Sequence, residues 1–214
     1  MRGDDEQLES LKEWWDKNGK SLIAGVVIAI VGVGGWKGWE NYQISQAESA
    51  SSLYAQLSQL VNASATEQRD EQAHALITQL TDNFSRSVYA DYARLIAARL
   101  AVENEQLEEA KAHLQTAMDA TRVEAVELVA RLRLARILHS LEQHEEALGL
   151  LNQSSAGGFT AEYEALRGDL LMATGNTLEA QSAYQRALEA SQQAGEVSPL
   201  VEMKLSRLTD LGDA

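Results

Sequence analysis

The amino-acid sequence predicts an all-α protein, with a single N-terminal transmembrane helix followed by an α-solenoid of helical hairpins. Three observations support this fold class. One uncharged apolar run lies near the N-terminus of a chain of 214 residues in which 23% of residues are charged. Ala, Leu, Glu and Gln are abundant and there is a single proline, a composition that favours helices. Aromatic and β-branched residues are sparse after residue 45, which argues against an extensive sheet.

The apolar run is SLIAGVVIAIVGVGGW, Ser21 to Trp36. Sixteen helical residues span about 24 Å, whereas the hydrocarbon core of a bilayer is about 30 Å thick. Lys20 and Lys37 extend the run, because their aliphatic stems let the charges reach outward. Rings that favour membrane interfaces flank it, namely Trp14 and Trp15 before it and Trp36, Trp39 and Tyr42 after it. We therefore predict a transmembrane helix over residues 21–39.

Two alternatives to a retained anchor stay open. A buried helix of a soluble domain would show a polar stripe at helical period, and this run has none. A cleaved signal peptide usually has a shorter apolar region that follows a basic segment. Here the first 20 residues contain four basic and six acidic residues. The flanking residues favour an anchor that stays in the membrane.

The distribution of Lys and Arg predicts the orientation of this anchor. Basic residues before the run are Arg2, Lys12, Lys17 and Lys20, whereas after Lys37 the next is Arg69. Because basic flanks stay on the cytoplasmic side, residues 1–20 are expected in the cytoplasm. The C-terminal domain is then translocated, into the periplasm if the source is a Gram-negative bacterium.

Small residues in the run form two pairs that suit contact with another membrane helix. Gly34 and Gly38 make a GxxxG pair, and Gly25 and Ala29 make a second small-xxx-small pair. Small side chains at such spacing let helices approach closely. The alternative is that glycine is simply common in membrane helices.

After the anchor, we expect a connecting helix and loop over residues 40–70 and a repeat domain over residues 71–214. Apolar residues at spacings of three and four predict a helix over 40–62, and Ala63–Asp70 is a polar loop. The same pattern predicts helices at 70–82, 87–103, 107–120, 123–141, 144–153, 161–173, 177–194 and 198–210. Turns are expected at Asn104-Glu105, Gln143, Gly157-Gly158 and Gly175-Asn176, with Thr177 capping the helix that follows.

The helical pairs repeat. Ala110, Ala147 and Ala180 occupy equivalent positions 37 and 33 residues apart, close to the 34-residue period of tetratricopeptide (TPR) repeats. The last unit matches best, through Gly168, Gly175, Ala180, Tyr184, Ala187 and Leu188. Small residues there let the two helices touch, and Tyr184 is expected to pack across to the neighbouring hairpin. Ala98 and Ala135 take the place of Gly168 in the earlier units, and Glu164 stands where the pattern has Trp. A generic helical bundle is the alternative.

Stacked hairpins leave a concave face built from the first helix of each pair, and such faces usually bind peptides or helices. The register places nine residues on it: Leu95, Arg99, Val102, Leu132, Arg136, His139, Ala165, Asp169 and Met172. We take Arg99, Arg136, His139 and Asp169 as the candidate protein-binding residues. Arg99 and Arg136 are cations in an acidic body, so we hypothesise that they bind a carboxylate or backbone carbonyls of a client. Each could instead be an ordinary surface residue.

Composition argues against several other functions. The net charge is −14, and residues 40–214 contribute −13, with 13 basic and 26 acidic residues, so binding to nucleic acid is disfavoured. The absence of cysteine excludes disulfides, thiolate metal sites and cysteine nucleophiles. The four histidines form no HExxH motif, and neither a nucleophile elbow nor a Walker loop is present. We therefore predict a protein that is not an enzyme and has no cofactor or metal.

Four segments together resemble the YfgM family, ancillary subunits of the SecYEG translocon in Gram-negative bacteria. They are Trp14-Trp15-Asp-Lys-Asn-Gly-Lys20, Gly35-Trp36-Lys-Gly-Trp39, Leu132-Arg-Leu-Ala-Arg136 and Leu166-Arg-Gly-Asp-Leu170. The resemblance implies an inner-membrane protein with a periplasmic TPR-like domain. It also implies association with SecYEG and with the membrane-anchored periplasmic chaperone PpiD, and a role in handing emerging secretory and outer-membrane proteins to periplasmic chaperones.

Two other functions stay open beside this one. The chain could be an inner-membrane TPR scaffold of another envelope assembly, or a soluble secreted TPR protein with a cleaved signal.

Overall fold

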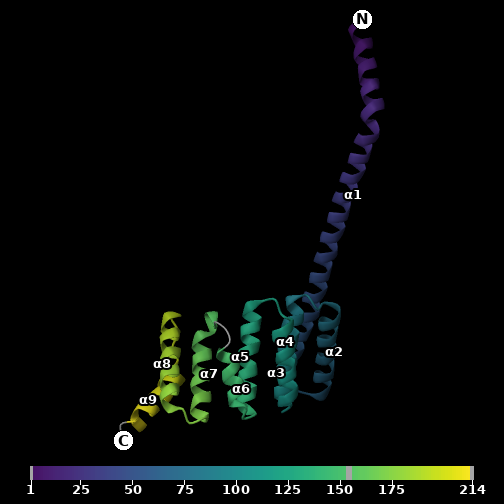
Figure 1. Cartoon of the computed structure of the whole chain (residues 1–214). Coiled ribbons are helices and arrows are strands. Elements are labelled where there is room, and N and C mark those ends of the chain that lie inside the picture. Colours follow the sequence, from purple (N-terminus) through teal and green to yellow (C-terminus); the bar gives the residue numbers. More distant parts are fainter. Residues whose placement is uncertain (1, 153–155, 213–214) are drawn as a thin grey trace. The chain divides into compact units, whose positions relative to one another are not determined.

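The computed structural model describes residues 2–152 and 156–212, and every element in those residues is helical, which confirms the all-α class. The α-helices, labelled in Figure 1, are α1 (Arg2–Val61), α2 (Glu67–Asn83), α3 (Val88–Glu103), α4 (Leu107–Ala120), α5 (Glu124–Ser140), α6 (His144–Asn152), α7 (Thr160–Ala173), α8 (Thr177–Gln193) and α9 (Pro199–Gly212). A short 3-10 helix, η1 (Gly157–Phe159), precedes α7. The eight helices predicted over residues 70–210 begin and end within three residues of these bounds. The helix predicted over 40–62 is the end of α1 and ends one residue earlier, and α2 begins at Glu67, inside the predicted loop Ala63–Asp70. The chain divides into two compact units, Met1–Ser49 and Ala50–Ala214, with the boundary inside α1.

In the first unit, α1 presents apolar side chains without a protein partner. Within the described residues, the stretch Trp14–Val61 contains the one window long and apolar enough to cross a membrane, and 6% of that window is buried. Ile28, Val31 and Trp36 are 71%, 67% and 73% exposed. A core helix of a soluble domain would bury such side chains, because each one removed from water stabilises the fold. The exposure therefore argues against the soluble-helix alternative.

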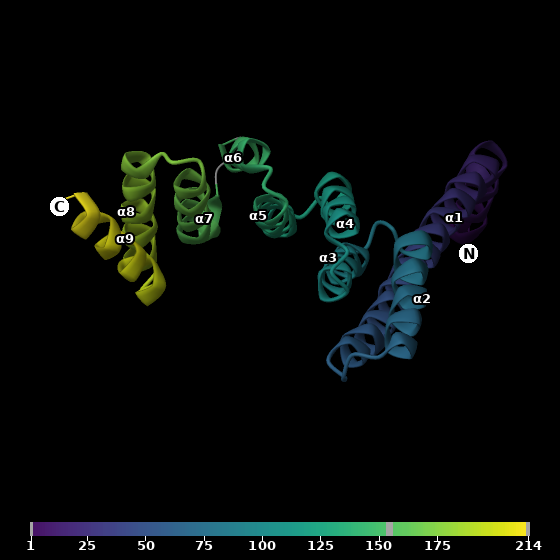
Figure 2. The same cartoon turned by 90° about the horizontal axis from the view of Figure 1, so that it is seen from below.

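The second unit is a series of antiparallel hairpins. Its first element is the end of α1, where Leu57 and Val61 pack in one core with residues of α2 and α3. The pairs α3–α4, α5–α6 and α7–α8 follow, and α9 packs on α8. α5 also contacts the first helices of both flanking pairs, α3 and α7. In Figure 2, α3 and α5 lie along one side of the unit and α4 and α6 along the other. This is the predicted stacking of hairpins.

Small side chains lie where the helices of a pair approach each other. The repeated alanines Ala110, Ala147 and Ala180 are each 0% exposed. The first helices contribute Ala98, Ala135 and Gly168 at equivalent positions. A Cβ atom added at Gly168 would lie 2.4 Å from Cε1 of Tyr184, which is too close for two carbon atoms. Glycine at this position is therefore a requirement of the packing.

Tyr184 packs toward the element that follows its hairpin, as predicted, because it shares a core cluster with Val201 and Leu208 of α9. Its ring also lies against Gly168 of its own hairpin, and its hydroxyl donates to Oδ1 of Asp169 at 2.7 Å. The glycine leaves a space that the ring fills. Thr177 does not cap α8, because it is the first helical residue, and the cap position belongs to Asn176, which makes no side-chain capping bond.

The hairpin turns share one backbone geometry. The N–H groups of Gln106, Gln143 and Asn176 each donate to the carbonyl five residues earlier at 2.8 Å. The residue before each donor has a positive φ: 60° at Glu105, 61° at Glu142 and 81° at Gly175. This is the Schellman geometry, which normally favours glycine. Two of the three turns use glutamate there, so the geometry repeats where the sequence does not.

Replacing Gly168 by alanine should destabilise the domain. The new methyl group must displace the buried Tyr184 ring, and overpacking of this kind costs about 1–3 kcal/mol. Gly149 in α6 is the matched control, since a Cβ there meets nothing within 4 Å. Gly149→Ala should be stabilising by about 0.5–1 kcal/mol through helix propensity. Urea unfolding of both variants measures the difference, and equal stability of the two variants would contradict the packing argument.

Candidate functional site

A hollow of about 440 Å³ lies on the face formed by the first helices α3 and α5. Arg99 of α3 and Arg133 and Arg136 of α5 line it, together with one acidic residue, Glu103. The rest of its lining is apolar: Ala98, Val102, Leu114 and Ile137. We call this the arginine hollow. It combines three cations with an apolar wall.

A second hollow of about 210 Å³ shares Arg136 with the first and continues toward α7 and α9. Its charged lining residues are Glu162, Asp169, Glu196 and Lys204 in addition to Arg136. We call it the acidic hollow, because three carboxylates outnumber two cations. The two hollows are adjacent because both are lined by Arg136, and we call them together the candidate groove.

The positive charge of the arginine hollow is poorly compensated. Glu103 accepts from Nε of Arg99 at 2.7 Å, but it also accepts from Nη2 of Arg69 at 3.0 Å. Arg69 is 6% exposed and pairs with Asp70 at 2.6 Å as well, so Asp70 and Glu103 together balance Arg69 and Arg99. Among the residues that the structure describes, Arg133 and Arg136 make no ion pair. Both guanidinium groups thus lack an ion-pair partner in the arginine hollow, although Glu162, Asp169 and Glu196 line the second hollow with Arg136.

This arrangement lowers the pKa of Arg133. Partial burial is the largest cause, followed by repulsion from Arg136 and from Arg99. Arginine stays charged at neutral pH, so a lowered pKa means that the folded protein holds this cation at a cost. Groups held at such a cost gather at functional sites more often than elsewhere.

The structure brings some of the predicted site residues together and separates others. Arg99 and Arg136 line the same hollow. Asp169 lies in the acidic hollow beside Arg136, but Lys204 and the hydroxyl of Tyr184 both donate to it. His139 is in neither lining. Its Nδ1 lies 3.2 Å from Nδ1 of His144 across the α5–α6 turn.

Sequence reasoning missed Arg133. The register placed Leu132 on the concave face, whereas Leu132 and Leu95 lie in the core at 5% and 8% exposure. The sequence spacing could have identified Arg133 as a site residue, because Arg133 and Arg136 are three residues apart and therefore share one face of a helix.

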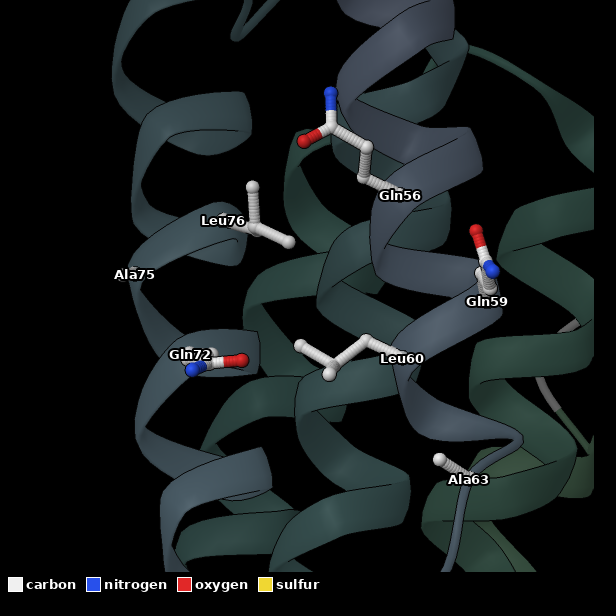
Figure 3. A pocket seen from close by; sticks show the side chains of 7 residues that line it. All are labelled: Gln56, Gln59, Leu60, Ala63, Gln72, Ala75 and Leu76. Carbon is white, nitrogen blue, oxygen red and sulfur yellow. The ribbon is translucent and has the colours of Figure 1, made fainter.

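A third hollow, of about 550 Å³, lies between the end of α1 and α2. Figure 3 shows Leu60 of α1 and Leu76 of α2 pointing into it. The other described residues that line it are Gln56, Gln59, Ala63, Gln72 and Ala75, none of which has a charge. A ligand there would find no charged group to fix its orientation, so the groove is the stronger candidate site.

The small residues of the membrane helix fall on two faces. From Gly25 to Gly34 is nine residues, or about two and a half turns of helix. Gly25 and Ala29 therefore share one face, and Gly34 and Gly38 lie on the opposite one. A Cβ added at any of the three glycines would meet nothing within 4 Å. One straight neighbouring helix could not contact all four positions.

Comparison with known proteins places the chain in a family. A model described as a tetratricopeptide repeat-like domain matches residues 12–210. A protein of Haemophilus influenzae named "Ancillary SecYEG translocon subunit" is 34% identical over 206 residues, covering 96% of this chain and 97% of that protein. The chain belongs to the family of ancillary SecYEG translocon subunits. Proteins of the same name from Aggregatibacter actinomycetemcomitans and Escherichia coli are 32% and 30% identical, again over 96% of this chain and 97% of each relative.

Family membership confirms the resemblance and the TPR-like fold derived from the sequence. The family supports a role associated with the Sec translocon. The apolar N-terminal helix and the name of the relatives together fit a single-pass protein of the inner membrane.

Replacing Arg133 by glutamine should leave the fold at least as stable as before. The change removes a cation that its surroundings disfavour, so we expect a stability within about 0.5 kcal/mol of the parent, or above it. The matched control is Arg94→Gln in α3, because Arg94 is 9% exposed and pairs with Asp91 at 2.9 Å. Breaking that buried pair should cost about 3 kcal/mol. Thermal and urea unfolding compare the two, and a large loss in Arg133→Gln would show that the residue is structural.

Proposed function

We propose that this chain is a non-enzymatic, single-pass subunit of the inner membrane that associates with SecYEG and binds polypeptide segments through its TPR-like domain. The observation that supports binding best is the groove itself, where Arg99 and Arg136 of successive hairpins line one hollow. The arginine hollow has no Ser, Thr or His among its described lining residues, and its chemistry is charge and apolar surface. Such a lining suits recognition of a chain better than reaction with it.

The proposed topology follows the charge pattern. Residues 1–20 lie in the cytoplasm, residues 21–39 cross the membrane, residues 40–70 connect, and residues 71–214 form the periplasmic TPR-like domain. The asymmetry of Lys and Arg around the span supports this orientation.

The proposed partners are the translocon, a PpiD-like membrane-anchored chaperone and unfolded secretory clients. In this arrangement the domain receives chains that emerge from SecYEG and passes secretory and outer-membrane proteins to periplasmic chaperones. Anchoring makes weak binding sufficient, because confinement near the channel raises the effective concentration of both partners. The groove needs only to hold a segment briefly.

A scaffold in another envelope assembly is the alternative. It shares the anchor and the TPR-like domain, but its membrane helix would contact other proteins. The name of the relatives favours the translocon. Contacts made by the span therefore separate the two functions.

A photo-crosslinking residue at Gly34, in cells expressing the full chain, should give an adduct with a translocon subunit, because that face has little side-chain volume to hold a neighbouring helix away. Ile28 is the control, since it points between the two small faces and is 71% exposed. We expect a weaker translocon adduct there. Equal translocon adducts at both positions would contradict a specific contact at the face of Gly34 and Gly38. Adducts with other envelope proteins alone would favour the scaffold function.

A second crosslinker at Val102 tests the groove. Val102 lines the arginine hollow and is 42% exposed, and its replacement keeps all three arginines. Adducts with newly translocated chains should form there and be several-fold weaker at Thr116, an exposed position on α4 outside the groove. No preference for Val102 would refute the groove as the binding site.

A further inference from the structure

We infer that the arginine hollow takes an acidic, apolar segment from the interior of a polypeptide chain, an assignment that rests on the groove being a polypeptide-binding site. The uncompensated arginines indicate that the ligand is acidic, and the apolar lining indicates that it has apolar side chains. The adjacent acidic hollow indicates that the ligand is an interior segment of a chain.

The charge argument begins with the count. Three arginines face one glutamate in the hollow, which leaves two formal positive charges. This excess is Arg133 and Arg136, because the carboxylates of Asp70 and Glu103 balance Arg69 and Arg99. A carboxylate entering here accepts paired hydrogen bonds from the planar guanidinium groups and relieves their mutual repulsion. Since residues 40–214 have a net charge of −13, this local attraction stands out against a repulsive background.

The apolar part of the lining selects what surrounds that carboxylate. Val102 is 42% exposed on the wall of the hollow, and Leu114 and Ile137 lie beside it. Apolar side chains of the ligand would cover this wall and exclude water. Charge-assisted hydrogen bonds are stronger in such surroundings than in water.

The junction at Arg136 indicates that the ligand continues beyond the hollow. Arg136 lines both hollows, so the two are adjacent, and we take the bound chain to continue from the first toward the second. The second hollow then limits the occupant, because Glu162, Asp169 and Glu196 repel a run of phosphates. These carboxylates make anionic lipid and nucleic acid poor occupants of the whole groove.

Binding of end-blocked peptides to the full chain in detergent tests this inference. The probe is a nine-residue peptide of Leu and Ser with a single Glu, and two companion peptides have Gln or Lys in place of that Glu. We expect the Glu peptide to bind about tenfold tighter than the Gln peptide or more, the effect of one charge-assisted hydrogen bond. The Lys peptide should bind more weakly than either, and added salt should reduce the difference.

The double variant Arg133→Gln, Arg136→Gln should abolish the preference for Glu over Gln. The matched control is Arg86→Gln, Arg122→Gln, which removes the same charge from two exposed arginines outside the groove and should keep the preference. Urea unfolding of each variant checks that the fold is intact.

Three outcomes would overturn the inference: equal binding of the Glu and Gln peptides, a preference that survives the double variant, or a requirement for a free terminal carboxylate. Arginine-dependent binding of vesicles with anionic lipid in place of the peptides would also overturn it. None of these results alters the Val102 crosslinks, so failure of the ligand class is distinguishable from failure of the groove as a protein-binding site.

Discussion

Close approach of two helices at small residues is the constraint on which the C-terminal unit depends. Ala98, Ala135 and Gly168 let each first helix lie against its partner, and at Gly168 the space between them is filled by the ring of Tyr184. The first helices of successive hairpins then lie side by side, as the contacts of α5 with both α3 and α7 demonstrate. Only in this arrangement do Arg99 and Arg136 line one hollow, although they come from different hairpins. The packing of small residues in the interior thus determines which charges meet at the surface.

Holding the arginines close together in the groove lowers the stability of the folded state, and the packing of the core must offset this loss. Several cations of the domain are paired, among them Arg94 with Asp91, Lys111 with Glu146, and Arg167 with Glu164. Arg86, Arg122 and Arg207 make no ion pair among the described residues, but all three are exposed. Arg133 differs from them because partial burial and two neighbouring arginines lower its pKa. A protein with marginal stability keeps such an arrangement where it has a use. The hollow between α1 and α2 has no charged residue among its described lining residues, so the groove is the stronger candidate for a binding site.

The sequence predicted the helices closely because apolar spacing and turn residues are local signals. It also placed Arg99 and Arg136 on one face, since a repeat register transfers position from one hairpin to the next. What the sequence did not reveal has non-local causes. The contact of the Tyr184 ring with Gly168 joins two helices, and spacing within one helix does not reveal it. His139 was placed on the face by register, but it contacts His144 across a turn. Asp169 does line the acidic hollow, but its ion pair with Lys204 of α9 could not be read from the register. Arg133 was overlooked because the register was applied to Leu132, one residue away.

The repeated turn affects how such a protein can change over evolutionary time. Its hydrogen bonds join backbone atoms only, and Glu105 and Glu142 adopt the positive φ that Gly175 adopts elsewhere. The turn that directs each hairpin is therefore largely independent of side-chain identity. A change of side chain at such a turn can therefore leave the backbone path of a hairpin as it is. The residues that line the groove and the turns that direct the hairpins can then change independently of each other.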